Sequence, residues 1–290
     1  MTHLDSNRGL NKAGSGILRL DGWPGGKLRW LAVGLFLIAG CGIDRPFIYH
    51  PEHEIESTPD SVGLSYENIF FKSADGVRLN GWFVPGSDPS NVMIWFHGNG
   101  GNIGGDVERL RLIHDELGLT VFVFDYRQYG LSGGSVTEEG TYRDAQAALV
   151  YLRSRSDLLP SRILYFGESL GSAVAVDLAT KAPPRALILE TPLTSIRDMA
   201  RVDLPYLPVG FLIEDKYDSL SKIPKIHVPL LILHGDRDEV VPFDQGRQLF
   251  EAANPPKMFY TIPGAHHNDT FIVGGQPYWD AWKRFLDRLE

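Results

Sequence analysis

The stretch Gly167-Glu168-Ser169-Leu170-Gly171 separates two segments of contrasting pattern. The mostly apolar run 162–166 before it predicts a buried strand, and the alanine- and valine-rich run 172–179 after it predicts a helix. A serine between two glycines at a strand-to-helix turn is typical of a nucleophile elbow, because so tight a turn leaves little room for side chains at the flanking positions. The pattern therefore predicts that Ser169 presents its hydroxyl above the edge of a sheet, as a nucleophile.

A serine nucleophile needs a general base, and the base needs an acid that orients it. With this type of elbow the acid follows the serine in the chain and a histidine follows the acid. The apolar run 229–233 is followed by three candidate acids, Asp236, Asp238 and Glu239, and a further candidate is Asp198. The apolar run 257–262 is followed by two adjacent candidate bases, His266 and His267.

An oxyanion hole would complete such a site, and it needs two backbone N–H donors. One donor is expected from the residue after the nucleophile, Leu170. The other is expected from the loop that follows the apolar run 91–96, where the sequence reads His97-Gly98-Asn99-Gly100-Gly101. The sequence predicts the amide of Asn99, or that of Gly100, as the second donor.

The remaining pattern predicts an α/β domain with one mostly parallel sheet and helices on both of its faces. Strands are expected near 66–72, 78–84, 91–96, 120–125, 162–167, 186–190, 229–233 and 257–262. Helices are expected near 105–117, 138–155, 169–180, 243–252 and 277–289. The first two strands are separated by Ala74-Asp75-Gly76 and predict a hairpin. The segment 195–228 is the sizeable insertion, and it predicts a small cap that forms an apolar pocket wall.

These motifs together resemble the BEM46-like serine hydrolases of the α/β-hydrolase fold. The resemblance spans about residues 66–290 and rests on 97–99, 125–130, 167–171, 234–238 and 264–269. It implies a triad of Ser169, Asp238 and His267. The eight strands predicted above would form the sheet of this fold, and the mechanism of such a triad needs no metal and no cofactor. The chain departs from the family at His266 and Gln128, where the family has glycine.

The expected reaction is cleavage of a carboxylic ester or thioester through an acyl-enzyme, on a small-molecule or lipid substrate. Two other functions stay open. A peptidase of the prolyl-oligopeptidase type shares the elbow and the order of the triad, although such enzymes usually carry a further domain. A binding lipoprotein without catalysis is the other alternative. Labelling of Ser169 by a fluorophosphonate would distinguish an enzyme from a binding protein.

The N-terminus predicts export. Lys27 and Arg29 precede an apolar run over 30–43, about 14 residues, which is shorter than the roughly 20 that cross a bilayer. Ile38-Ala39-Gly40-Cys41 resembles the lipobox of bacterial lipoproteins. We therefore expect a signal peptide over 1–40, lipidation at Cys41, a tether over 41–63 and a catalytic domain over 64–290. The protein would be membrane-anchored in the periplasm, at the outer membrane or on the cell surface; an ordinary signal peptide or an uncleaved anchor is the alternative.

Composition excludes some other classes. The net charge of −8 does not favour nucleic-acid binding, and a single cysteine in 290 residues cannot form an internal disulfide.

His97 and His234 are expected to be structural. Asp125 and Arg127 are expected to form a buried structural pair with each other. The sequence leaves the oligomeric state open.

Overall fold

The computed structural model describes residues 45–203 and 213–289. Within them, an eight-stranded sheet runs in the order β10-β9-β8-β7-β4-β6-β3-β2. Its strands are β2 (Glu67–Lys72), β3 (Arg78–Val84), β4 (Asp88–Phe96), β6 (Leu119–Asp125), β7 (Ile163–Glu168), β8 (Leu187–Glu190), β9 (Leu230–Gly235) and β10 (Lys257–Ile262). Only β3 is antiparallel to its neighbours β2 and β6, so the predicted mostly parallel sheet is confirmed.

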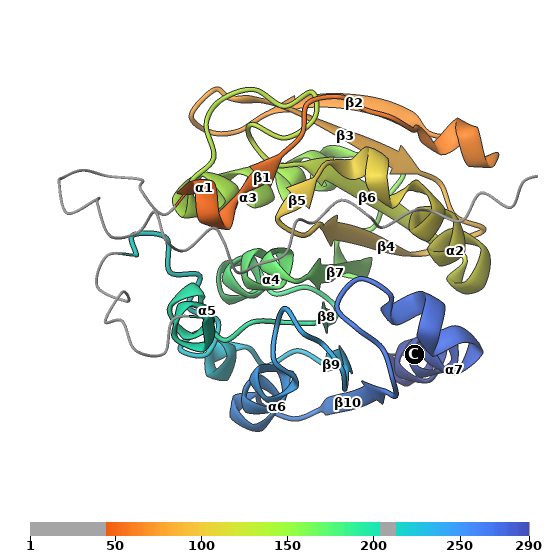
Figure 1. The fold of residues 1–290 in the computed structure, drawn as a ribbon. Helices are drawn as coiled ribbons and strands as arrows, with labels where there is room; N and C mark the ends of the chain where they lie inside the picture. Colours follow the sequence, from red (N-terminus) through yellow and green to blue (C-terminus); the bar gives the residue numbers. More distant parts are fainter. Residues whose placement is uncertain (1–44, 204–212, 290) are drawn as a thin grey trace, which may run out of the picture. The chain divides into compact units, whose positions relative to one another are not determined.

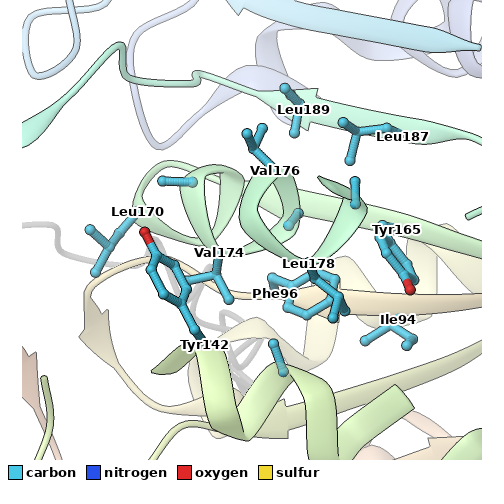
Figure 2. Packing of buried hydrophobic residues seen from close by; sticks show 14 of the residues in the cluster. Ile94, Phe96, Tyr142, Tyr165, Leu170, Val174, Val176, Leu178, Leu187 and Leu189 are labelled. Atoms are coloured by element: carbon cyan, nitrogen blue, oxygen red, sulfur yellow. The ribbon is translucent and has the colours of Figure 1, made fainter. Parts of the chain in front are cut away.

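Helices cover both faces of this sheet, because each central strand buries side chains on both sides. On β4, Ile94 and Phe96 pack into the core shared with α3 (Glu138–Ser154), α4 (Leu170–Lys181) and α6 (Phe243–Ala252). The intervening Met93 and Trp95 pack into the opposite core, with α2 (Val107–Leu117) and α7 (Thr270–Leu286). Figure 1 shows the two groups of helices on opposite sides of the sheet, and Figure 2 shows Val174 and Leu178 of α4 packed near Phe96.

Local chemistry explains several element ends. The β2–β3 turn contains Gly76 at φ +84°, a conformation that glycine adopts without strain. Helix α3 begins after Thr137, whose hydroxyl accepts a hydrogen bond from the Gly140 amide. Helix α7 begins earlier than the predicted 277–289, at Thr270, and is interrupted at Gly275, which has φ 50° and ψ −143°. The pattern of the apolar residues revealed only the part after this interruption.

Residues 45–63 differ from the expected tether, because they pack as part of the folded domain. They form α1 (Arg45–Ile48), β1 (His50–Pro51) and the 3₁₀ helix η2 (Pro59–Val62). Strand β1 pairs in parallel with β5 (Gly100–Gly101). Tyr49 is buried, and its hydroxyl donates to Asp215 over 2.8 Å. The prolines that suggested a linker occupy places that tolerate proline, such as the start of η2 and a two-residue strand.

The insertion 195–228 contains α5 (Ile196–Asp203) and the 3₁₀ helix η6 (Ile223–Lys225). Several apolar residues on which the cap prediction rested, among them Tyr206, Leu207, Phe211 and Leu212, lie outside the described residues, as do 1–40 and Cys41. Across 45–203 and 213–289, no helix has the length and apolar character needed to cross a membrane.

Candidate active site

The turn between β7 and α4 has the geometry of a strained elbow. Ser169 has φ 50° and ψ −119°, an unusual backbone conformation for a residue with a side chain. A Cβ added to Gly167 would lie 2.6 Å from the Gly171 carbonyl oxygen, and one on Gly171 would lie 2.0 Å from the Phe96 carbonyl oxygen. Both glycines are therefore required by close backbone approach.

The structure brings Ser169, His267 and Asp238 together from three separate loops. His267 Nε2 lies 3.0 Å from Ser169 Oγ, and His267 Nδ1 lies 2.8 Å from Asp238 Oδ2. Ser169 and His267 are 9% and 8% exposed, and the Asp238 side chain is fully buried. The serine follows β7, the aspartate follows β9 and the histidine follows β10, so the parallel sheet aligns the three loops at its carboxyl edge.

Asp238 is held as a carboxylate by several donors. The amides of Val240 and Val241 donate to Oδ1 over 2.9 and 2.8 Å, and His234 Nε2 lies 3.3 Å from Oδ2. Burial raises the pKa of Asp238, but hydrogen bonds from His234 and His267 outweigh it and hold this pKa well below its ordinary value. A negative charge is therefore maintained beside the His267 ring.

The other candidate acids and the other candidate base make different contacts. Asp236 accepts from the Gly264 amide over 2.6 Å. Glu239 lies 2.8 Å from Nδ1 of His266, and both of these side chains are more than half exposed. Asp198 accepts from the hydroxyl groups of Thr194 and Ser195 near the start of α5. None of these contacts involves Ser169.

Two backbone segments border the serine where an oxyanion would develop. Leu170 is the first residue of α4, and an N–H at this helical position has no acceptor within its helix. The positive end of the helix dipole also favours negative charge here. On the other side, a Cβ added to Gly98 would lie 3.8 Å from Ser169 Cβ, so the loop that carries Asn99 runs beside the serine. Asn99 is held through its side chain, which donates to the Ile48 carbonyl over 2.8 Å.

His97 and Asp125 form a second histidine–aspartate pair, which differs from the pair of His267 and Asp238. They are 1% and 0% exposed, and His97 Nε2 lies 3.7 Å from Asp125 Oδ1, beyond hydrogen-bond distance. Burial lowers the pKa of His97 to about 4. Burial also raises the pKa of Asp125 to about 7, although the hydrogen bond from the Ile103 amide opposes this.

The predicted pairing of Asp125 with Arg127 is wrong. Arg127 instead lies 2.8 Å from Asp144 on α3 and 2.9 Å from Asp75 in the β2–β3 turn. The chain turns after β6, so Asp125 accepts from Ile103 while Arg127 reaches the hairpin and α3.

Sequence reasoning missed a cluster of buried polar side chains behind the elbow. Arg109 on α2 lies 2.7 Å from Glu168 and 2.7 Å from Glu190, and Glu190 also accepts from Tyr278 and Thr270. Two sequence features could have indicated it. Glu190 ends an apolar run, and Arg109 precedes the apolar Ile113 by four residues, which places both on one face of the predicted helix 105–117. Within 45–203 and 213–289, no cluster of three histidine, cysteine or acidic side chains is suited to bind a metal ion.

Comparison with known proteins identifies the fold and the family. A family model described as the alpha/beta hydrolase fold matches residues 91–216, and a model described as a serine hydrolase matches residues 169–268. An esterase of Pyrococcus furiosus has a similar structure, with a TM-score of 0.70 at 21% identity, covering 82% of this chain and 98% of the esterase. At that identity the likeness supports the fold alone.

Relatives in other organisms are more similar in sequence. An uncharacterized protein of Mycobacterium tuberculosis is 39% identical over 83% of this chain and 86% of its own length. The alpha/beta hydrolase domain-containing protein WAV2 of Arabidopsis thaliana is 37% identical, over 80% of this chain and 82% of its own length. Protein bem46 of Schizosaccharomyces pombe is 36% identical, over 79% of each chain. The chain therefore belongs to the BEM46-like family of α/β-hydrolase fold serine hydrolases.

Proposed function

We propose that this serine hydrolase cleaves carboxylic esters or thioesters through a triad of Ser169, His267 and Asp238. The observation that carries the proposal is the continuous hydrogen-bonded chain from the serine hydroxyl through the imidazole to a fully buried carboxylate. A histidine fixed in this way at Nδ1 leaves Nε2 free to take the proton of the hydroxyl.

In the first half of the reaction, Ser169 Oγ attacks the carbonyl carbon while His267 Nε2 takes the hydroxyl proton. The negative oxygen of the tetrahedral intermediate accepts hydrogen bonds from the amides of Leu170 and Asn99. One donor of this kind contributes roughly 3–4 kcal/mol to transition-state stabilisation. The bond to the leaving group then breaks, and His267 gives the proton to the departing oxygen or sulfur.

In the second half, water replaces the leaving group. His267 takes a proton from the water as its oxygen attacks the acyl carbon of the acyl-enzyme. The bond to Ser169 Oγ breaks, the serine recovers its proton from His267, and the carboxylic acid is released. Asp238 keeps the imidazole in the required tautomer and stabilises its transient positive charge in both halves.

The experiment that tests the proposal is hydrolysis of p-nitrophenyl esters of increasing acyl length by the full-length protein. Ser169→Ala should abolish turnover at every length. Ser154→Ala, at an exposed serine on α3, is the matched control and should retain it. Fluorophosphonate labelling of the wild type without ester turnover would favour a peptidase, and absence of labelling would favour a binding protein; either result would contradict the proposed reaction.

We also propose that a lipid on Cys41 attaches the protein to a membrane. It is supported by the basic residues, the apolar run 30–43 and the lipobox-like stretch that ends at this cysteine. Multiple acyl chains hold a protein on a membrane, whereas a single chain retains it only marginally. In bacterial cells, the wild type should sediment with membranes and Cys41→Ser should not carry a lipid label. A wild-type protein that stays in the soluble fraction would contradict this part.

A further inference from the structure

Arg109 is a buried arginine on a helix that contributes no residue to the proposed triad. Its side chain is 4% exposed, although it lies on α2, which also has a solvent-exposed face. Burial of a guanidinium group is strongly unfavourable unless opposite charges and hydrogen bonds compensate for the lost water. The partners of Arg109 therefore indicate why the position holds an arginine.

Those partners come from three elements that also carry or support the proposed active site. Nη1 lies 2.7 Å from Glu168 Oε2 at the end of β7, and Nη2 lies 2.7 Å from Glu190 Oε1 at the end of β8. Nη2 also donates to the Tyr278 hydroxyl on α7 over 3.3 Å. Three aromatic rings surround the guanidinium carbon at 5.0–5.4 Å, those of Trp95, Phe166 and Phe271. These rings add cation–π attraction to the two ion pairs.

One branch of the cluster leads directly to the nucleophile. Glu168 precedes Ser169 in the chain, and the Ser169 amide donates to the Glu190 carbonyl over 3.0 Å. Glu168 and Glu190 are also direct neighbours in the parallel pairing of β7 with β8. Two carboxylates in this position repel each other, and Arg109 is the cation that bridges them.

The other branch leads to the loop of the proposed base. Glu190 accepts a hydrogen bond from the Thr270 hydroxyl, and Thr270 begins α7 three residues after His267. Glu190 also accepts from the Tyr278 hydroxyl over 2.7 Å. Thr270, Tyr278 and Glu190 are each no more than 1% exposed, so these bonds are protected from water. A single guanidinium therefore connects the elbow to the start of the helix behind the histidine.

We propose that Arg109 is a positioning residue, which holds the Ser169 elbow and the His267 loop at the separation that proton transfer requires. The inference rests on the proposed triad. The planar guanidinium of Arg109 contacts both glutamates and the tyrosine at once through its separate N–H groups. The single ammonium group of a lysine does not reproduce this planar arrangement of donors. Displacement of reacting groups by about 1 Å lowers rates by about 100-fold even when substrate binding is retained.

The test is Arg109→Lys compared with Arg127→Lys in the full-length protein. Arg127 is a matched control because it is also buried and also bridges two carboxylates, those of Asp75 and Asp144. These carboxylates accept hydrogen bonds from Arg127 and Arg143, and from no residue of the triad. We expect Arg109→Lys to lower kcat about 30- to 100-fold with KM within about threefold of the wild type. Arg127→Lys should lower the denaturation midpoint while its folded fraction keeps the wild-type kcat. Equal kcat in the two folded variants would overturn the proposal.

A second readout does not depend on turnover. The proton on His267 Nδ1, in the hydrogen bond to Asp238, is followed by NMR as a low-field resonance, which should shift or broaden in Arg109→Lys and stay unchanged in Arg127→Lys. If wild-type protein turns over no ester, the proposed reaction fails by itself and the resonance still decides the role of Arg109. An unchanged resonance in Arg109→Lys would overturn that role.

Thr270→Val provides a milder variant in case Arg109→Lys does not fold. It keeps the shape of the side chain and removes only the hydroxyl that donates to Glu190. We expect kcat to fall several-fold with KM unchanged, together with a shift of the His267 resonance. Wild-type kcat and an unshifted resonance in this variant would overturn the proposal.

Discussion

Two buried histidine–aspartate pairs lie at strand ends of this domain, and the pKa values of their aspartates are shifted in opposite directions. In the pair of His267 and Asp238, ring and carboxylate are 2.8 Å apart, and the pKa of the aspartate is held below its ordinary value. In the pair of His97 and Asp125, the closest approach is 3.7 Å. Here burial lowers the pKa of the histidine to about 4 and raises that of the aspartate to about 7.

The difference follows from the number of donors and not from the depth of burial. Both carboxylates are fully buried, with 0% of each side chain exposed. Asp238 accepts from two backbone amides and contacts two imidazoles, which favours the charged form. Asp125 accepts from the Ile103 amide through Oδ1, and Oδ2 has no hydrogen-bond partner among the described residues. A buried aspartate beside a histidine is therefore expected to stay ionised only where further donors compensate for the loss of water.

The largest expected effect comes from removing the charge of the first pair. Asp238→Asn should lower kcat by about 10⁴-fold, because the amide favours the wrong tautomer of His267. Its oxygen still accepts from the Val240 and Val241 amides, so the fold should persist. Steady-state kinetics with a denaturation curve measures both quantities. A loss of less than tenfold in kcat would contradict the role of Asp238.

In the second pair, the two pKa shifts affect stability in opposite directions over the same pH range. The pKa of Asp125 is raised on folding. The contribution of Asp125 to the free energy of unfolding is therefore complete below the ordinary pKa of an aspartate, and it is lost as pH rises through about 7. The pKa of His97 is lowered on folding. The contribution of His97 to the free energy of unfolding is therefore complete above about pH 6.5, and it is lost as pH falls to about 4. Comparison of each single variant with the wild type should therefore isolate the pH dependence that comes from the residue it replaces.

Asp125→Asn removes the pH dependence of stability that comes from Asp125. Relative to the wild type, its free energy of unfolding should rise by up to about 4 kcal/mol between pH 4 and pH 7, since one pKa unit corresponds to about 1.36 kcal/mol. Urea denaturation of both proteins at each pH gives this difference. A constant difference across the range would show that Asp125 is ionised in the folded protein.

His97→Gln removes the pH dependence of stability that comes from His97. Its free energy of unfolding relative to the wild type should rise by up to about 3 kcal/mol as pH falls from 6.5 to 4, because the wild type must hold this ring neutral on acidification. The same denaturation series provides the measurement. A difference that falls toward acidic pH would mean that His97 is charged in the folded state.

The smallest effect is expected at the histidine beside the proposed base. His266 is about half exposed and contacts Glu239, with no contact to Ser169 or Asp238 among its hydrogen bonds. Hydrogen bonding to Glu239 raises the pKa of His266, and this contact occupies Nδ1 of the ring. His266→Ala should therefore change kcat by less than about threefold, whereas His267→Ala should abolish turnover. Comparable losses in the two variants would place both rings in the mechanism.

Much of the site was accessible from the sequence because its determinants are local. The order of strand, Gly-x-Ser-x-Gly and helix identifies the elbow, and loops that follow parallel strands must meet at the carboxyl edge of the sheet. This reasoning brought Ser169 to one edge with the loops of Asp238 and His267. The choice of one acid among Asp236, Asp238 and Glu239 came from family resemblance, because the spacing along the loop allows each of them.

Local patterns also misled the prediction in two places. Prolines near 46, 51 and 59 suggested a tether, but the segment 45–63 is packed through contacts such as that of Tyr49 with Asp215, 166 residues away. The sequence analysis predicts a buried pair of Asp125 and Arg127, but Arg127 lies against Asp144. In both cases a long-range contact decided the outcome.

The sequence by itself determined the fold, the elbow and the order of the loops that carry the proposed triad, because hydrophobic periodicity and turn chemistry depend on near neighbours in the chain. Only the tertiary structure decided which buried charges meet. Arg109 on α2 contacts Glu190 at the end of β8, and Glu190 accepts a hydrogen bond from Thr270, 80 residues further along the chain. Such pairings depend on which side chains lose water together when helices pack on the sheet, and no spacing in the sequence encodes that directly.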